Sequence, residues 1–191
     1  MFFFTADTHL GHDNIIRYCN RPFASVDEMD ETIIKNWNSV VGRTDTVYHL
    51  GDFSFKNHLF YLRRLNGNII LIEGNHDKGD LTGFSSVHKM KTIVIEKTTI
   101  VLCHFAMRVW EKSHFNSWHC YGHSHGELAS LGKSYDVGVD NNSFMPISFD
   151  ELYTIMQKLP DNENWLEKLK GYNPQEFLAA KKLVEQGIDV D

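Results

Sequence analysis

The chain has 191 residues, of which 42% are hydrophobic and 23% charged, and its net charge is −6. This composition is typical of one globular domain, and the negative charge argues against a broad basic face that coats extended nucleic acid. No segment approaches the roughly 18 apolar residues of a membrane span, and the three cysteines include no closely spaced pair, so we expect a cytoplasmic protein without disulfides or a membrane partner.

The first half of the chain alternates between expected strands and helices. Short apolar runs predict strands at Phe2–Thr5, Thr46–Leu50 and Ile69–Ile72. Between the first two, the spacing Ser25-x-x-Glu28 is that of a capping box, and apolar residues at helical spacing after it predict a helix over residues 25–41. Leucines at 59, 62 and 65 predict a shorter helix that ends before Gly67.

The second half is expected to be mostly β-structure followed by helices. Strands are predicted at Lys91–Ile95, Thr99–Leu102, Ser117–Tyr121 and Ser134–Val139, the first two paired through a turn. A second capping box at Ser148 opens a helix that Pro160 ends, and Asn173-Pro174 opens a last one. We therefore predict a single α/β domain over residues 1–191, with two packed mixed β-sheets flanked by helices and C-terminal helices over about 148–188.

Five polar motifs each follow the point where an apolar run stops. They are Asp7-Thr8-His9, Gly51-Asp52, Gly74-Asn75-His76-Asp77, Cys103-His104 and Gly122-His123-Ser124-His125. Because the carboxyl ends of strands in open α/β sheets face the ligand crevice, we expect these motifs to converge. Nitrogen and oxygen ligands without thiolate suit Mn, Fe, Zn, Co or Ni. Two carboxylates would leave two divalent cations with a net charge of about +2, which attracts an anionic phosphate.

In this order the five motifs resemble those of the calcineurin-like metallophosphoesterase superfamily, and the stretch from Asp7 to Phe23 resembles a small single-domain branch of bacterial and phage phosphoesterases. The resemblance implies a four-layer α/β/β/α sandwich with two metal ions, of which manganese is favoured. It assigns one ion to Asp7, His9, Asp52 and His125, and the other to Asp52, Asn75, His104 and His123. A hydroxide would bridge the ions together with Asp52. His76 would assist departure of the leaving group, oriented by Asp77.

The sequence departs from the family pattern at one place. Many members carry Gly-Asp-x-x-Asp, whereas this chain reads Gly51-Asp52-Phe53-Ser54-Phe55, so a supporting carboxylate is missing and the metal preference stays open. We predict substrate contacts at His12, Arg17 and Arg21, since arginine forks suit phosphate. For the two arginines the alternative is a solvated face or an ion pair with residues 27–31. His49, inside a strand, is expected to be packed or hydrogen-bonded.

The function predicted from these residues is hydrolysis of a phosphate ester. A phosphodiester of a small nucleotide or cyclic phosphate is preferred, because no long insertion is present to build a groove for a protein substrate. A phosphomonoesterase or a nuclease on the same site are alternatives, although no basic run with interleaved aromatics supports binding of a long strand. A scaffold that has lost its chemistry is disfavoured, because every expected motif position is retained.

Overall fold

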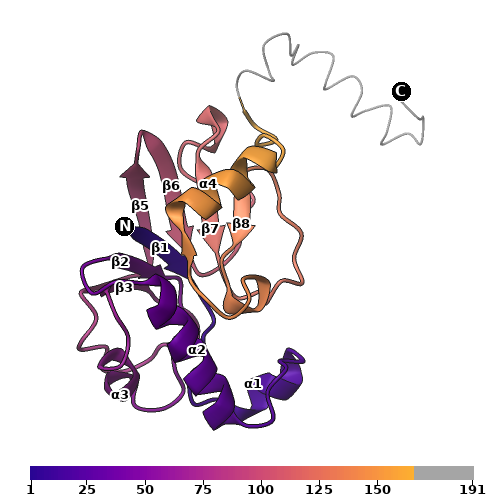
Figure 1. The fold of residues 1–191 in the computed structure, drawn as a ribbon. Helices are drawn as coiled ribbons and strands as arrows, with labels where there is room; N and C mark the ends of the chain where they lie inside the picture. Colours follow the sequence, from indigo (N-terminus) through magenta and orange to yellow (C-terminus); the bar gives the residue numbers. More distant parts are fainter. Residues whose placement is uncertain (166–191) are drawn as a thin grey trace, which may run out of the picture.

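The computed structural model describes residues 1–165, which form two β-sheets flanked by helices (Figure 1). The first sheet has the strand order β4-β3-β2-β1-β9 and the second the order β5-β6-β7-β8. The first sheet contains β1 (Phe2–Thr5), β2 (Thr46–His49), β3 (Asn68–Ile72), β4 (Ser86–His88) and β9 (Ile147–Ser148). The second contains β5 (Met90–Ile95), β6 (Thr98–Cys103), β7 (Trp118–Tyr121) and β8 (Ser134–Asp136).

Both sheets are mixed. Strands β1 to β4 run parallel to one another and β9 pairs antiparallel with β1. In the second sheet β5 and β6 form an antiparallel hairpin, while β6, β7 and β8 are parallel. The parallel strands therefore bring several carboxyl ends to the same edge of each sheet, which is where ligand sites of α/β proteins form.

Four α-helices lie in the described part of the chain: α1 (Asp13–Tyr18), α2 (Val26–Val40), α3 (His58–Leu62) and α4 (Phe149–Lys158). Helix α4 begins with a complete capping box between Ser148 and Glu151. At α2 the Ser25 hydroxyl accepts from the Glu28 amide, but the Glu28 carboxylate accepts from the amide of Ala24. None of the helices within residues 1–165 is long and apolar enough to cross a membrane.

Two apolar cores cover the two faces of the first sheet. Phe3 and Val47 point toward α2, whose Ile33 and Trp37 belong to the same core. Their neighbours in the strands alternate to the other face: Phe4, for example, packs in the core shared with the second sheet and α4. In Figure 1, α2 lies against the first sheet and α4 beside β7 and β8. The sandwich holds the strand ends in fixed relative positions.

The predicted fold class of mixed α/β with two flanked sheets is confirmed. The predicted strands and helices within residues 1–165 are present, although α3 ends at Leu62 and β8 at Asp136, earlier than expected. Helix α1 and the edge strands β4 and β9 were not predicted as elements; each edge strand is at most three residues long and depends on its pairing with β3 or β1. The predicted helix after Asn173 lies outside the described residues.

Candidate metal centre

The five polar motifs lie at the carboxyl ends of five strands. Asp7, Asp52 and Asn75 follow β1, β2 and β3 of the first sheet, and His104 and His123 follow β6 and β7 of the second. Hydrogen bonds connect the strand ends across each sheet: the Asp7 amide donates to the Gly51 carbonyl at 2.9 Å, and the Gly122 amide to the His104 carbonyl at 3.0 Å. The structure therefore brings together at one edge the side chains that the sequence predicted to converge.

The predicted metal ligands gather in two groups. Ligand atoms of Asp7, His9 and His125 lie within 4.8 Å of one another, and so do those of a second group, Asp52, His104 and His123. Asn75 belongs with the second group, because its Oδ1 lies 3.1 Å from His104 Nε2.

Asp52 lies between the two groups. Its Oδ2 is 3.7 Å from His9 Nε2 and 3.6 Å from His104 Nε2, so one carboxylate oxygen faces an imidazole of each group. Its other oxygen, Oδ1, accepts a hydrogen bond of 2.8 Å from the His76 amide. Asp7 is held in the same way, with Oδ2 accepting from the His123 amide at 2.8 Å. Each carboxylate is thus fixed through one oxygen while the other remains for a ligand.

The backbone at these residues is strained. Five of the seven predicted ligands have left-handed φ angles, with values of 57° at Asp7, 49° at His9, 56° at Asp52, 67° at His123 and 47° at His125. This conformation costs a residue other than glycine about 1–3 kcal/mol, and it clusters at functional sites because it aims side chains inward. Seven other non-glycine residues within residues 1–165 also have left-handed φ angles, so the strain agrees with the predicted site without defining it.

Two glycines allow the strand ends to approach one another. A Cβ atom on Gly74 would lie 2.6 Å from the amide nitrogen of Asp52, and one on Gly122 would lie 2.5 Å from Cβ of Ala6. Both added atoms would also collide with a carboxylate, that of Asp52 or that of Asp7. Only glycine, which has no Cβ, permits these close approaches, and this explains sterically why both motifs carry glycine at these positions.

Several buried polar atoms of the site have no hydrogen-bond partner in the described structure: Asp7 Oδ1 and both ring nitrogens of His9. An unsatisfied buried polar atom costs about 1–3 kcal/mol, so such atoms are rare without a reason. They belong to a carboxylate and an imidazole that already lie 3.8 Å apart, which is a spacing that a shared cation would satisfy. The residues present therefore fit a bound divalent metal ion.

The electrostatics of the site point the same way. Burial raises the pKa of the Asp7 carboxyl well above its usual range, and the charges of Asp136 and Asp52 raise it further. Burial lowers the pKa of His9, and Arg21 adds to this effect. The imidazole is therefore neutral, the form that binds a metal. A cation between these groups would relieve the repulsion among the carboxylates.

Asp140 is a site residue that the sequence analysis missed. Its Oδ2 accepts from His125 Nδ1 at 2.7 Å, and its two oxygens accept from Arg21 Nε and Nη2, both at 2.8 Å. Burial works to raise the pKa of Asp140, but the hydrogen bonds from His125 and Arg21 hold it below its usual range. A carboxylate behind a ligating histidine fixes the ring and its tautomer. The sequence does contain a signal for Asp140, because it comes after strand β8 just as the other site residues come after their strands.

Arg21 occupies a different place from the predicted one. It is only 4% exposed, and besides Asp140 it donates to the carbonyl oxygens of Asp7 at 2.7 Å and Thr8 at 3.1 Å. All three guanidinium nitrogens of Arg21 donate to Asp140 or to the backbone of the first motif, so no pair of them remains to bind a phosphate. The alternative partner, the acidic stretch at 27–31, is not used either; the acid that pairs with Arg21 is 119 residues away in sequence.

Asp77 also differs from the expectation. Its carboxylate accepts from the amides of Asp52 at 2.7 Å, Gly74 at 2.8 Å and Phe53 at 3.0 Å. No hydrogen bond among the described residues joins it to His76, so its observed contribution is to fasten the loop after β3 to the loop after β2. His76 itself has a side chain that is 45% exposed, with Nε2 4.0 Å from Asp52 Oδ2.

Of the other two predicted substrate contacts, His12 lies beside a predicted ligand and Arg17 contacts only its own helix in the described residues. His12 is 5.7 Å from the His9 ring between centroids and stacks on Phe55 at 3.9 Å. Phe55 stands where many family members carry the second aspartate, and its ring also lies 5.4 Å from His9 and 4.7 Å from His76. Arg17 is exposed and donates to Asn14 Oδ1 at 2.9 Å. Substrate contacts at His12 and Arg17 stay predictions.

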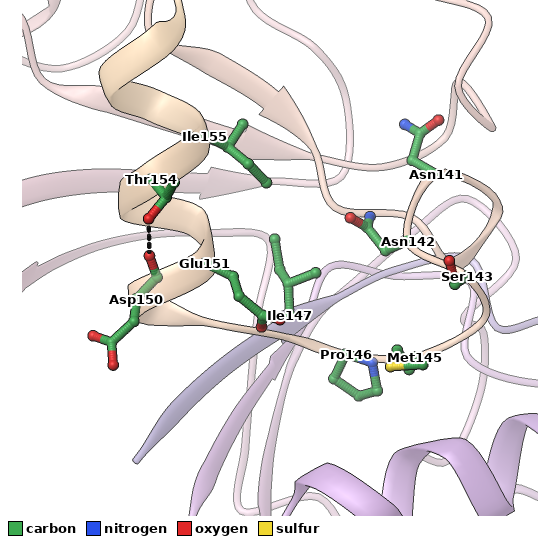
Figure 2. A pocket seen from close by; sticks show the side chains of 10 residues that line it. All are labelled: Asn141, Asn142, Ser143, Met145, Pro146, Ile147, Asp150, Glu151, Thr154 and Ile155. Carbon is green, nitrogen blue, oxygen red and sulfur yellow. Dashed lines mark hydrogen bonds between the residues drawn. The ribbon is translucent and has the colours of Figure 1, made fainter.

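A cavity of about 580 Å³ lies away from this site. Figure 2 shows it between the start of α4 and the loop at residues 141–147, where Met145, Pro146 and Ile147 lie opposite Ile155. None of the predicted ligands or catalytic residues lines it, and it offers no imidazole. The chemistry of the donor set, rather than cavity size, therefore locates the candidate site.

The comparisons with known proteins identify the family. The calcineurin-like phosphoesterase superfamily domain matches residues 2–134, so the chain belongs to this superfamily, whose enzymes are metal-dependent hydrolases of phosphate esters although some members are non-catalytic. The chain is 36% identical over 165 residues to an uncharacterized protein of Methanocaldococcus jannaschii, covering 80% of this chain and 89% of the relative. The Gene 66 protein of Mycobacterium phage L5 is 40% identical over 80 residues, 39% of this chain and 38% of that protein.

A solved structure shows the same fold. The crystal structure of a protein of unknown function from Aquifex aeolicus matches with a TM-score of 0.66 and 28% identity, covering 81% of this chain and 98% of that one.

Proposed function

We propose that this protein is a binuclear metal-dependent phosphoesterase that prefers a phosphodiester of a small nucleotide or cyclic phosphate. The observation that carries the proposal is the pair of ligand groups, Asp7, His9 and His125 beside Asp52, His104 and His123, with Asp52 between them. Two divalent ions bound there would acidify a water and stabilise charge on the phosphoryl oxygens. We favour manganese, and the mixed nitrogen and oxygen ligands also suit Fe, Zn, Co or Ni.

His76 and Asp77 are the residues that we assign to protonation of the leaving group. In hydrolysis, a water oxygen bonds to phosphorus, the bond from phosphorus to the leaving oxygen breaks, and the leaving alcohol takes a proton. We assign the donation of that proton to His76; its half-exposed ring and the hydrogen bond from its amide to the Asp52 carboxylate support this role. Asp77 fixes the loop that carries His76. General acid assistance of this kind contributes about 10²–10⁴-fold in rate.

The preference for a nucleotide-like substrate is supported by two exposed aromatic rings beside the ligand groups. Phe55 is 41% exposed and lies against His9, and Phe105 is 47% exposed and lies 4.8 Å from His123 between ring centroids. Aromatic faces next to a phosphate site are suited to stacking with bases. The net charge of −6 continues to disfavour a long nucleic-acid strand.

The proposal is tested with purified protein and two chromogenic esters, bis-p-nitrophenyl phosphate and p-nitrophenyl phosphate. We expect Mn²⁺-dependent release of p-nitrophenol, faster from the diester, that stops when a chelator removes the metal and returns when metal is added back. A panel of cyclic and linear nucleotides then ranks natural ester classes. Metal-loaded protein that hydrolyses neither chromogenic ester nor any nucleotide of the panel would refute the proposal and favour a scaffold.

A further inference from the structure

A second, smaller cavity lies directly beside the candidate metal centre. Its volume is about 220 Å³, and it is enclosed by the loops that follow β2 and β3. Its walls include Phe55, Lys56, His58, His76, Lys78 and Phe84. His76 connects the cavity to the metal centre, because its Nε2 lies 4.0 Å from Asp52 Oδ2 while its ring forms part of the cavity wall. A group bonded to a phosphoryl at the metal centre can therefore extend past His76 into this cavity.

The cavity is positively charged. Lys56 and Lys78 both line it, and no ion pair among residues 1–165 includes either of them. The one acid in the wall, Asp77, already accepts three backbone hydrogen bonds. Lys56 also lines a neighbouring cavity with Asp27, Asp30 and Glu31; burial raises the pKa of Asp30, and the charge of Lys56 only partly opposes this. Lys78 does not line that acidic cavity and forms no ion pair within residues 1–165, so we take it as the cation that a ligand in the smaller cavity would meet.

The size of the cavity limits what it can hold. Pockets that enclose a drug-sized molecule measure roughly 300–1,000 Å³, so a cavity of about 220 Å³ accommodates one chemical group rather than a whole nucleotide. Its position next to the expected proton donor makes that group the one that leaves. His58, whose Nε2 donates to the Thr82 carbonyl at 2.8 Å, holds the outer loop that closes the cavity.

We propose that this cavity is a leaving-group subsite for a group that carries its own negative charge, with Lys78 as the residue that recognises it. The inference rests on the proposed phosphoesterase function and narrows it: the preferred substrate is a phosphodiester whose leaving alcohol bears a further phosphate or carboxylate. Charge recognition in a partly exposed cavity adds to specificity without taking part in bond breaking. Lys78 is therefore a specificity residue, distinct from the metal ligands.

The test uses two diesters that differ by one carboxylate on the leaving ring: methyl 4-nitrophenyl phosphate and methyl 3-carboxy-4-nitrophenyl phosphate. The measured quantity is the ratio of kcat/KM for the carboxylated ester to that for the plain one, in Mn²⁺-loaded protein. A partly exposed ion pair contributes up to about 1 kcal/mol, so Lys78→Gln should lower this ratio roughly three- to fivefold. Lys35→Gln, an exposed lysine of α2 outside the cavity, is the matched control and should leave the ratio unchanged.

A binding measurement separates failure of the subsite from failure of the proposed function. Calorimetric titration of the Mn²⁺-loaded protein with the free phenols, 3-carboxy-4-nitrophenol and 4-nitrophenol, reports the same recognition without turnover. We expect tighter binding of the carboxylated phenol, weakened by salt and lost in Lys78→Gln. If the protein hydrolyses neither these esters nor the chromogenic esters and nucleotides above, the proposed function fails and binding alone decides the subsite. Equal ratios and equal binding in wild type and Lys78→Gln would overturn the subsite even in an active enzyme.

Discussion

The hydrogen-bonded chain from His125 through Asp140 to Arg21 makes a strong prediction about metal binding. In Asp140→Asn the side chain keeps its shape but loses the charge that faces Arg21 at 2.8 Å and His125 at 2.7 Å. Removing one partner of a buried ion pair costs about 3–5 kcal/mol, because the other charge stays buried and uncompensated. Losing the carboxylate behind a ligating histidine costs about 10–100-fold in metal affinity. Asp140→Asn should therefore weaken both the fold and the metal site.

The two effects are measured separately. Denaturant unfolding of the metal-free protein gives the free energy of unfolding, and calorimetric titration with Mn²⁺ of the folded protein gives the affinity. Glu31→Gln is the matched control, since it breaks an exposed arginine–carboxylate pair with Arg64, at 2.7 Å, and should cost less than about 1 kcal/mol without changing Mn²⁺ affinity.

Arg21→Lys supplies a second variant that keeps the positive charge but loses the planar fork that holds Asp140 and the Asp7 carbonyl. Its Mn²⁺ affinity should fall as well, with a smaller loss of stability than in Asp140→Asn. If both folded variants bind Mn²⁺ with wild-type affinity, the hydrogen bonds from Arg21 through Asp140 do not position His125. If Asp140→Asn lowers the free energy of unfolding no more than the Glu31→Gln control does, the predicted cost of the buried ion pair is refuted.

Three further predictions concern single residues. Asp52→Asn should lose tight binding of both ions, because its carboxylate lies between the two ligand groups, and full two-ion occupancy by elemental analysis would contradict this. His76→Ala should keep the wild-type metal content and lose about 10²–10⁴-fold in kcat on diesters, a loss that is smallest for esters whose leaving group needs no proton; unaltered turnover on every ester would remove His76 from the mechanism. Burial lowers the pKa of His49 to about 3, whereas its ordinary pKa is about 6.5. Below pH 6.5 the unfolded chain therefore binds a proton at His49 that the folded protein does not, and the free energy of unfolding falls as the pH falls. The metal-free protein should thus lose about 1.4 kcal/mol of unfolding free energy per pH unit through this residue between about pH 6 and 3, and His49→Gln should flatten that slope in denaturant titrations.

From the site geometry we expect the motifs at the strand ends to tolerate few substitutions. The ligands sit on strained backbone, and Gly74 and Gly122 lie too close to carboxylates for any side chain. Strain of this kind persists only where surrounding contacts hold it. Here the contacts are the amide bonds to Asp77, which join the loops after β2 and β3, and the Arg21 bonds to the Asp7 and Thr8 carbonyls. Arg21, which was predicted to touch substrate, and Asp77, which was predicted to orient the His76 ring, instead hold these loops in place.

The sequence by itself determined the donor set and where it would gather. Side-chain alternation along a strand and the abrupt change from apolar to polar residues at its end are local properties, so the positions after β1, β2, β3, β6 and β7 could be located without knowing which strands pair. The same local rules located α2 and α4 through Ser25 and Ser148. The same local rules could have identified Asp140, which comes after β8, but the sequence prediction did not include it.

The tertiary structure decided what depends on residues far apart in the chain. Arg21 finds Asp140 across 119 positions, and β9 joins β1 at the edge of the first sheet only when the chain returns after the second sheet is complete. Whether a polar group faces solvent, a ligand or a backbone amide is likewise set by neighbours from other elements, as the three amides bonded to Asp77 show. Contacts of this kind are fixed by packing the whole domain, because no local pattern in the sequence encodes the partner.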